Sequence, residues 1–322
     1  MALGMPSIEV TFKQLAATAV RRSSRGVLAL VVRDDTADTP EIASFTTYLD
    51  IKEGAYTEEN MAMIKQAFTG QPAKVIIVKQ AVDGTTEALK TALDSILFNW
   101  LTMATSSESD QEAIVAYTQN RNKTRKGKKV KALVYNVATA DDIQIVRFTT
   151  EKAVMDKTEV AGWKLLARIA GVLAGLPMTR SATYYELADI QSVTEPKDMD
   201  KEVDDGNLFL FNDEGVVRIA RAVNSLTTTG TTYTEDMKSI AIVEAMNLLE
   251  EDISTTFKND YLGKYKNSYD NQSLFIAAVN GYFKDLSKEE ILDPNYSNLA
   301  GVDVEAQRDA WLATGKAEAS EW

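Results

Sequence analysis

The chain has 322 residues, contains neither cysteine nor histidine, and carries a net charge of −12. The missing cysteines exclude disulfide bonds and thiol catalysis, and the missing histidines remove the commonest general base and transition-metal ligand. The strong negative charge argues against nonspecific binding of nucleic acid by the whole protein. At this length the chain is large enough for about two domains.

Two features bear on membranes. The N-terminus lacks a basic segment followed by an apolar run and a cleavage site, so we expect no signal peptide. The longest apolar stretch, residues 165–176, contains Arg168 and is too short to span a bilayer. We therefore expect no direct contact with a membrane.

Residues 1–26 have the pattern of a terminal strand followed by a hinge. Ile8, Val10 and Phe12 alternate with polar residues, which is the two-residue period of a half-buried strand. Leu15 and Val20 extend the apolar pattern. The predicted hinge is basic and rich in small residues, namely Arg21, Arg22, Ser23, Ser24 and Gly26. Two arrangements stay open, because such a strand can form an edge of its own domain or pair with a neighbouring chain.

Strands and helices alternate in the first half of the chain. Val27–Val32 is a nearly continuous apolar run, as expected for a strand covered on both faces. Helices are expected after Thr57, after Thr85 or Thr86, and before about Asn122. Residues 98–103 fit either a helix or a buried strand, and we favour the strand. The expected strands are 27–32, 73–78, 98–103, 130–135 and 143–148. This order predicts a mostly parallel mixed α/β sheet.

The second half predicts a sheet with helices. Residues 161–176 form a strong helix in which Gly162, Gly171 and Gly175 permit close packing, and Pro177 ends it. Further expected elements are a strand at 182–190, a four-residue hairpin turn at 212–215, a helix from Thr234 to about Lys258, and a last helix from Asp303. The inward stripe of the helix from Thr234 is expected to include Ile240, Val243, Met246 and Ile253. The fold class is therefore α/β and α+β, with an N-terminal strand arm.

Motifs for nucleotide chemistry are missing from the sequence. No G-x-G-x-x-G follows Val27–Val32, and no G-x-x-x-x-G-K-[ST] occurs anywhere. Asp198, Asp200, Glu202 and Asp204 have the spacing of a calcium loop, but the glycine and distal glutamate of that loop are missing. We expect no catalytic residue, cofactor or metal. An α/β enzyme dependent on a nucleotide or small molecule, without recognisable motifs, is the alternative.

A basic segment precedes one of the expected strands. It holds seven basic residues, Arg121, Lys123, Arg125, Lys126, Lys128, Lys129 and Lys131. One interpretation is a solvated loop, and another is an electrostatic contact with an acidic surface of a sister subunit. Binding of nucleic acid is disfavoured, because no aromatic residues lie between the charges.

Five short pieces, in the same order along the chain, resemble contractile phage tail sheath proteins. The resemblance is to the short sheaths of prophages and of phage-tail-like bacteriocins from Gram-positive bacteria. The matching pieces are residues 4–12 (GMPSIEVTF), 167–177 (ARIAGVLAGLP), 179–184 (TRSATY), 213–227 (DEGVVRIARAVNSLT) and 261–270 (YLGKYKNSYD).

This resemblance implies a structural protein without catalysis. Sheath subunits polymerise as a helical sleeve around an inner tube, and contraction drives the tube through a bacterial envelope. The implied partners are other sheath subunits, the inner tube protein, and baseplate and tail terminator proteins. The implied location is a virion tail or phage-tail-like particle made in the bacterial host cytoplasm.

The resemblance also assigns roles to parts of the chain. It implies an N-terminal arm (1–22) that adds a strand to an adjacent subunit, an α/β domain (23–178) and a C-terminal α+β assembly domain (179–322). A tube-facing helix is expected near the C-terminus, with Gln307, Arg308 and Trp311 as its candidate contacts. The family pattern continues into a C-terminal strand, whereas this sequence ends at Glu321-Trp322. Either a strand follows, or the subunit does without it. The sheath has an extended and a contracted state. In one of them we expect the basic segment to form salt bridges between subunits with the acidic clusters at residues 34–35, 141–142, 198–205 and 213–214.

Overall fold

The computed structural model describes residues 20, 25–125, 127–138 and 140–321. The chain divides into two compact units. The larger unit is Ser23–Glu251, and the smaller unit comprises Met1–Arg22 and Asp252–Trp322. Leu173 and Ala182, on either side of the expected boundary near residue 178, share one hydrophobic core.

Within the described residues, seven strands form one sheet in the order β10-β6-β5-β4-β1-β3-β2. The central strand β1 pairs in parallel with β3 on one side and with β4 on the other. Only β2, at one edge, runs antiparallel to its neighbour. The strands are β1 (Val27–Arg33), β2 (Ile42–Phe45), β3 (Lys74–Gln80), β4 (Trp100–Met103), β5 (Lys131–Tyr135), β6 (Ile145–Phe148) and β10 (Asn207–Leu208). The predicted mostly parallel mixed sheet is confirmed, and residues 100–103 are a strand.

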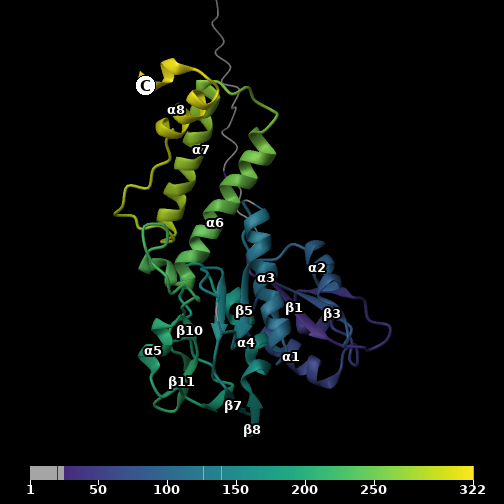
Figure 1. Cartoon of the computed structure of the whole chain (residues 1–322). Coiled ribbons are helices and arrows are strands. Elements are labelled where there is room, and N and C mark those ends of the chain that lie inside the picture. Colours follow the sequence, from purple (N-terminus) through teal and green to yellow (C-terminus); the bar gives the residue numbers. More distant parts are fainter. Residues whose placement is uncertain (1–19, 21–24, 126, 139, 322) are drawn as a thin grey trace, which may run out of the picture. The chain divides into compact units, whose positions relative to one another are not determined.

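Helices cover both faces of this sheet (Figure 1). Alternate residues of β1 point to opposite faces. Leu28 and Leu30 pack with residues of α1 (Glu58–Thr69) and α4 (Leu166–Gly175). Ala29 and Val31 pack with residues of α2 (Thr86–Asp94) and α3 (Glu108–Thr124). The hydroxyl groups of Thr57, Thr85 and Ser107 cap the three α-helices α1, α2 and α3.

Two glycines let α1 and α4 approach closely. A Cβ atom on Gly171 would lie 2.0 Å from the carbonyl oxygen of Ala67, and one on Gly175 would lie 1.9 Å from that of Gly70. No other residue fits at these positions without moving the backbone. The expected helix 161–176 is confirmed, although its first turn, Gly162–Leu165, is a 3-10 helix.

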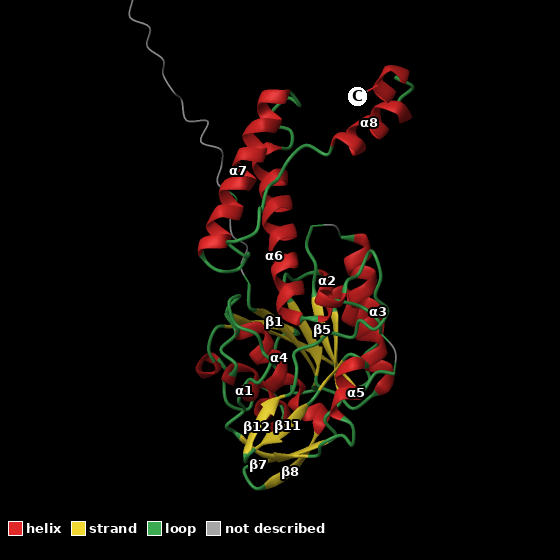
Figure 2. Cartoon of the chain, turned by 90° about the vertical axis from the view of Figure 1, so that its left-hand side faces the viewer, coloured by secondary structure: helices red, strands yellow, loops and turns green. Residues whose placement is uncertain are grey.

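Short antiparallel strands complete the larger unit (Figure 2). They are β7 (Lys152–Met155), β8 (Thr158–Ala161) and β9 (Ile190–Val193), followed by the hairpin β11 (Leu210–Asp213) and β12 (Val216–Ile219), with the helix α5 (Met199–Asp204) between β9 and β10. The expected strand 182–190 is wrong, because Tyr184 has φ 60° and the chain turns there. The hairpin turn has two residues rather than four, Glu214 and Gly215, both with positive φ.

Helix α6 (Ile240–Thr256) begins later than expected. Thr234 precedes a separate 3-10 helix, Glu235–Lys238, and α6 follows it. The expected inward stripe is also partly wrong, because Met246 is 36% exposed. The buried side of α6 in the larger unit carries Ile240 and Val243 of the expected stripe together with polar residues, among them Asn247 and Glu251.

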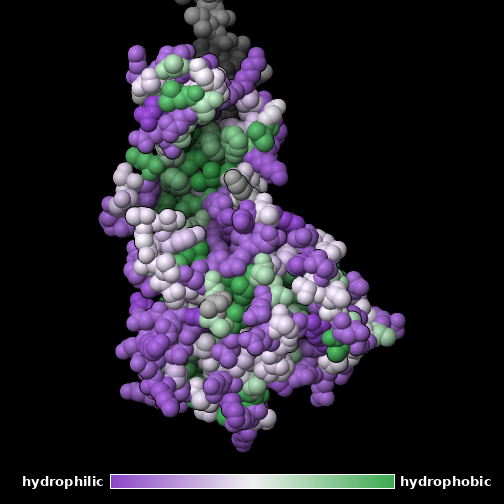
Figure 3. All heavy atoms as spheres, viewed as in Figure 1, coloured by the Kyte–Doolittle hydropathy of each residue, from purple (hydrophilic) through white to green (hydrophobic). Residues whose placement is uncertain are grey.

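The smaller unit contains α7 (Tyr269–Lys288) and α8 (Val304–Ala313), and Asp303 caps α8 as expected. Aromatic side chains of the segment that follows α6 pack against those of α7. The ring centres of Tyr261 and Phe275, for example, lie 4.9 Å apart. A groove of about 640 Å³ lies between these aromatic residues and α8. Figure 3 shows hydrophobic side chains lining this recess. None of the described helices is long and apolar enough to cross a bilayer.

Candidate assembly site

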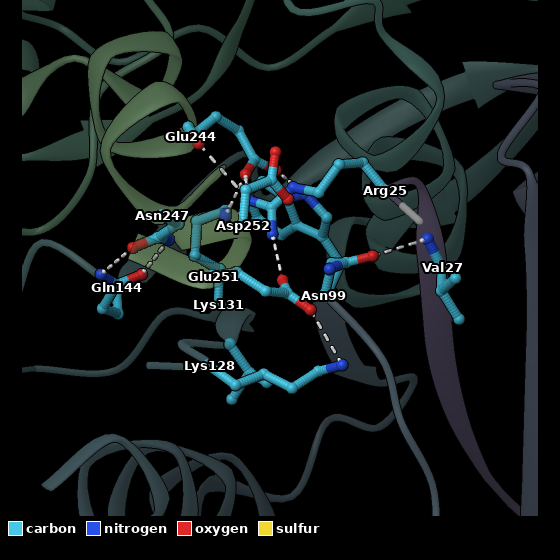
Figure 4. Close-up of polar contacts among 12 residues, drawn as sticks. Arg25, Val27, Asn99, Lys128, Lys131, Gln144, Glu244, Asn247, Glu251 and Asp252 are labelled. Atoms are coloured by element: carbon cyan, nitrogen blue, oxygen red, sulfur yellow. Dashed lines mark hydrogen bonds and ion pairs between the residues drawn. The ribbon is translucent and has the colours of Figure 1, made fainter. Parts of the chain in front are cut away.

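A cluster of charged side chains lies at the amino ends of the central strands of the seven-stranded sheet (Figure 4). Parallel pairing places Leu28 of β1 beside Trp100 of β4, and Trp100 beside Lys131 of β5. The amino ends of these three strands therefore lie next to one another, and α6 passes close to them. The polar cluster, as we call it below, consists of Arg25, Lys128, Lys131, Glu244 and Glu251.

The two glutamates of α6 each bind two basic residues. Glu244 Oε2 accepts from Arg25 Nη2 at 2.5 Å and from Lys131 Nζ at 2.6 Å. Glu251 accepts from Arg25 Nη1 at 2.9 Å and from Lys128 Nζ at 2.9 Å. Trp100 also donates its indole N–H to Glu244 Oε1 at 2.8 Å. Charge-assisted hydrogen bonds of this length are among the stronger polar contacts in proteins.

Burial determines the electrostatics of the polar cluster. The side chain of Lys131 is 1% exposed, and burial lowers its pKa to about 8 although Glu244 acts in the opposite direction. Burial alone would raise the pKa of Glu244, but the charges of Lys131 and Arg25 outweigh it and hold that pKa below its usual value. Glu244 therefore remains ionised beside the cationic side chains of Lys131 and Arg25.

An uncharged pair supports the same helix. The amides of Gln144 and Asn247 exchange hydrogen bonds of 2.9 and 2.8 Å, which fix α6 to the segment before β6. Asn99 accepts a hydrogen bond from the backbone of Val27 at 3.2 Å and so fixes the start of β1. Together these contacts hold the start of the sheet and the buried side of α6 as one body.

Most of the predicted arm and hinge lies outside the described residues. This holds for Ile8, Val10, Phe12 and Leu15, and for Arg21, Arg22, Ser23 and Ser24. Val20 is half-buried. Gly26 has φ +80°, and a Cβ atom there would lie 2.9 Å from the carbonyl oxygen of Ala174. The last residue of the predicted hinge is thus tightly packed.

The basic segment is mostly engaged within the chain. Arg121 is 3% exposed, donates to Leu93 O at 3.0 Å and lies 4.5 Å from the ring of Phe98. Arg121 is therefore inaccessible to a neighbouring chain. Arg125 pairs with Asp94 at 3.0 Å, Lys128 belongs to the polar cluster, and Lys129 donates to Asn122 O at 2.7 Å. Lys123 is exposed, and Lys126 lies outside the described residues.

The other predicted residues occupy the surface. On α8, Gln307 lines the groove of the smaller unit, and Arg308 Nε lies 3.6 Å from Asp309 Oδ1. After α8, Lys316 places its Nζ atom 3.6 Å from the centre of the Trp311 ring. Asp198 caps α5 through a 3.0 Å bond from Lys201 N. In the part of the chain that the structure describes, no group of three or more acidic side chains could hold a metal ion.

The sequence reasoning missed Arg25, Glu244 and Glu251. A signal for them exists, because Glu244, Asn247 and Glu251 are spaced three and four residues apart and so share one face of a helix. Polar residues at that spacing look like a solvated face, and only the basic partners from distant segments reveal that they are buried.

At the opposite end of the strands, the carboxyl end of β1 makes several polar contacts within the chain. In open α/β sheets, ligands bind beyond the carboxyl ends of the strands, where strand order reverses, which here is at β1 and β4. Arg33, at the end of β1, forms two hydrogen bonds with Asp110, at 2.7 and 3.0 Å. It also donates to the carbonyl oxygens of Ala81, Val82 and Gly84. These contacts tie the carboxyl end of β1 to α3 and to the segment between β3 and α2.

Comparison with known proteins identifies the family. A curated relative, the tail sheath protein of Clostridium phage phiCD119, is 32% identical over 316 residues, which cover 95% of this chain and 86% of the relative. The chain belongs to the tail sheath protein family. A family model described as the phage tail sheath C-terminal domain matches residues 232–316 of the sheath subunit. The chain is thus a structural sheath subunit of a contractile injection system.

Solved structures share the fold of this sheath subunit. A sheath tail protein from Desulfitobacterium hafniense has a TM-score of 0.75 at 12% identity, covering 85% of this chain and 88% of that one. A sheath tail protein from Listeria innocua has a TM-score of 0.73 at 13% identity, with 88% and 89% covered. The helical sheath of the anti-feeding prophage in its contracted state has a TM-score of 0.70 at 14% identity, with 89% and 85% covered.

Proposed function

We propose that this sheath subunit polymerises as a helical sleeve around an inner tube and contracts to drive the tube through a bacterial envelope. The observation that carries the proposal is the relationship to a tail sheath protein over 95% of the chain. Subunits that contact each other head to tail without closing a ring form a helix. The further partners are the inner tube protein, the baseplate and the tail terminator, and the subunit is made in the host cytoplasm.

The N-terminal segment links the subunits in this proposal. Ile8, Val10 and Phe12 have the alternation of a strand that can add to a sheet of another copy. Nineteen extended residues before Val20 span about 60 Å, which is enough to reach an adjacent subunit. Backbone hydrogen bonds across such an added strand keep copies linked while their lateral faces exchange partners.

The proposal includes no catalysis and no cofactor. Contraction needs two packings of one subunit, with the extended packing higher in free energy and kinetically trapped. No nucleotide is consumed in such a single event. The sequence contains neither of the two glycine-rich phosphate-binding motifs, which supports this view. On the smaller unit, we assign Gln307, Arg308 and Trp311 of α8 to the face toward the tube.

The test is electron microscopy of the purified protein, with and without residues 1–20. The intact chain is expected to form tubes, rings or sheath-like polymers. The shortened chain is expected to keep its unfolding temperature and to remain unpolymerised, because the removed strand belongs to another copy. A monodisperse intact chain would contradict the polymer, and a shortened chain that unfolds would place the strand in its own core.

A further inference from the structure

The polar cluster occupies a special position along the chain. The larger unit begins at Ser23 and ends at Glu251, so the chain enters and leaves it at these two points. Arg25 is the third residue of this unit and Glu251 is the last. The 2.9 Å contact between Arg25 Nη1 and Glu251 Oε2 therefore joins the point of entry to the point of exit.

A second contact makes this connection rigid. Arg25 Nη2 binds Glu244 at 2.5 Å, seven residues before Glu251 and on the same face of α6. A planar guanidinium that binds two carboxylates two turns apart is fixed in both position and orientation. The side chains involved are 13%, 16% and 4% exposed for Arg25, Glu244 and Glu251, so water screens these contacts weakly.

The residues after Arg25 are held by close packing and by the sheet. Gly26 is packed against Ala73 and Ala174, and the next residue begins β1, the strand bonded on both sides by β3 and β4. Lys131 and Lys128 hold the same two glutamates from the start of β5 and the segment before it. Force applied to the N-terminal segment is therefore passed to α6 and to the sheet together.

We propose that Arg25 is a positioning residue that clamps the root of the N-terminal segment to α6 and so fixes where that segment leaves the larger unit. The clamp is required for assembly and not for folding of the larger unit. This inference rests on the proposed function insofar as assembly depends on the N-terminal segment.

The test variant is Arg25→Lys, which keeps the charge but cannot bind both carboxylates in the same planar geometry. Arg33→Lys is the matched control, because Arg33 also binds a carboxylate through two nitrogens in the same unit. Hydrogen exchange is measured on peptides that cover residues 25–29 and 244–251. Arg25→Lys is expected to speed exchange in both peptides by about tenfold, whereas Arg33→Lys leaves both unchanged.

Assembly is scored on the same proteins by electron microscopy. Arg25→Lys is expected to reduce the yield of polymers severely, while Arg33→Lys assembles like the wild type. Exchange that is unchanged in either peptide would refute the clamp. Faster exchange in both peptides with normal assembly would refute its positioning role. If the wild-type chain forms no polymers, the proposed function fails, and the exchange result alone decides whether Arg25 clamps the two segments.

Discussion

Asp34 shows how a single carboxylate can hold the carboxyl end of the sheet together. It follows β1 directly and is 1% exposed. Its oxygens accept hydrogen bonds from the backbones of Thr36 and Thr57, both at 2.8 Å, and from the side chain of Asn60 at 2.7 Å. Burial alone would raise the pKa of Asp34, but these hydrogen bonds outweigh it and lower the pKa to about 2. The carboxylate therefore orients the start of α1.

Replacing Asp34 by Asn is expected to destabilise the chain at neutral pH. The pKa of Asp34 is 3.8 in the unfolded chain and about 2 in the folded chain. Its contribution to stability is present above the unfolded value and is lost as the pH falls through the folded value. We expect Asp34→Asn to lower the free energy of unfolding by about 2 kcal/mol at pH 7, and the difference to shrink toward pH 2.

Urea denaturation at several pH values measures this difference. Asp35→Asn is the matched control, because Asp35 is exposed and accepts one backbone hydrogen bond, from Val82. If Asp34→Asn lowered the free energy of unfolding equally at pH 7 and toward pH 2, ionisation of Asp34 would contribute nothing to stability.

At the level of elements, the sequence predicts what hydrophobic patterning determines. Buried parallel strands are continuous apolar runs, so β1, β3 and β5 were found close to their observed bounds. Thr57 marked the start of α1 correctly, and Thr85, one of the two residues considered, caps α2. Local sequence is sufficient for these elements.

Elements shaped by distant contacts could not be predicted in the same way. Helix α6 buries Glu244 and Glu251 only because Arg25, Lys128 and Lys131 come from other parts of the chain. The turn at Tyr184 depends on a positive φ that no local pattern indicates for an aromatic residue. The polar cluster, which is the candidate assembly site, was therefore missed for the same reason.

The contact between β5 and α6 predicts an unusual dependence of stability on pH. Burial lowers the pKa of Lys131 from 10.5 to about 8, so the folded state releases this proton at a lower pH than the unfolded chain. Between these values the unfolded chain binds more protons, and the free energy of unfolding rises with pH. At about pH 9.5 the expected gain over pH 7 is roughly 2 kcal/mol.

Denaturation of Lys131→Met over the same range tests this link. The variant loses the pH-dependent gain, so its stability falls further behind the wild type as the pH rises from 7 to 9.5. Lys65→Met, which alters an exposed lysine of α1, is the control and should keep the wild-type slope. Parallel curves for the wild type and Lys131→Met would show that Lys131 has the same pKa in both states.

At the scale of the whole molecule, charge opposes the proposed polymer. Each copy carries a net charge of −12, so copies repel one another at low salt. Screening shortens this repulsion to about 8 Å at 0.15 M ionic strength. The proposed assembly therefore needs local contacts of opposite sign at the surfaces that meet.

Lys123 offers the clearest place to test such a contact. It is exposed at the end of α3, whereas Arg121, Arg125, Lys128 and Lys129 are engaged within the chain. We expect Lys123→Glu to lower the yield of polymers at 0.15 M salt because it replaces an attraction between subunits by a repulsion. Lys65→Glu changes the net charge equally on another helix, and it should reduce the yield much less. Sedimentation measures the yield of polymers for both variants, and the unfolding temperatures of the two variants are matched beforehand. Equal yields for the two variants would mean that net charge, and not a contact at Lys123, governs how the subunits meet.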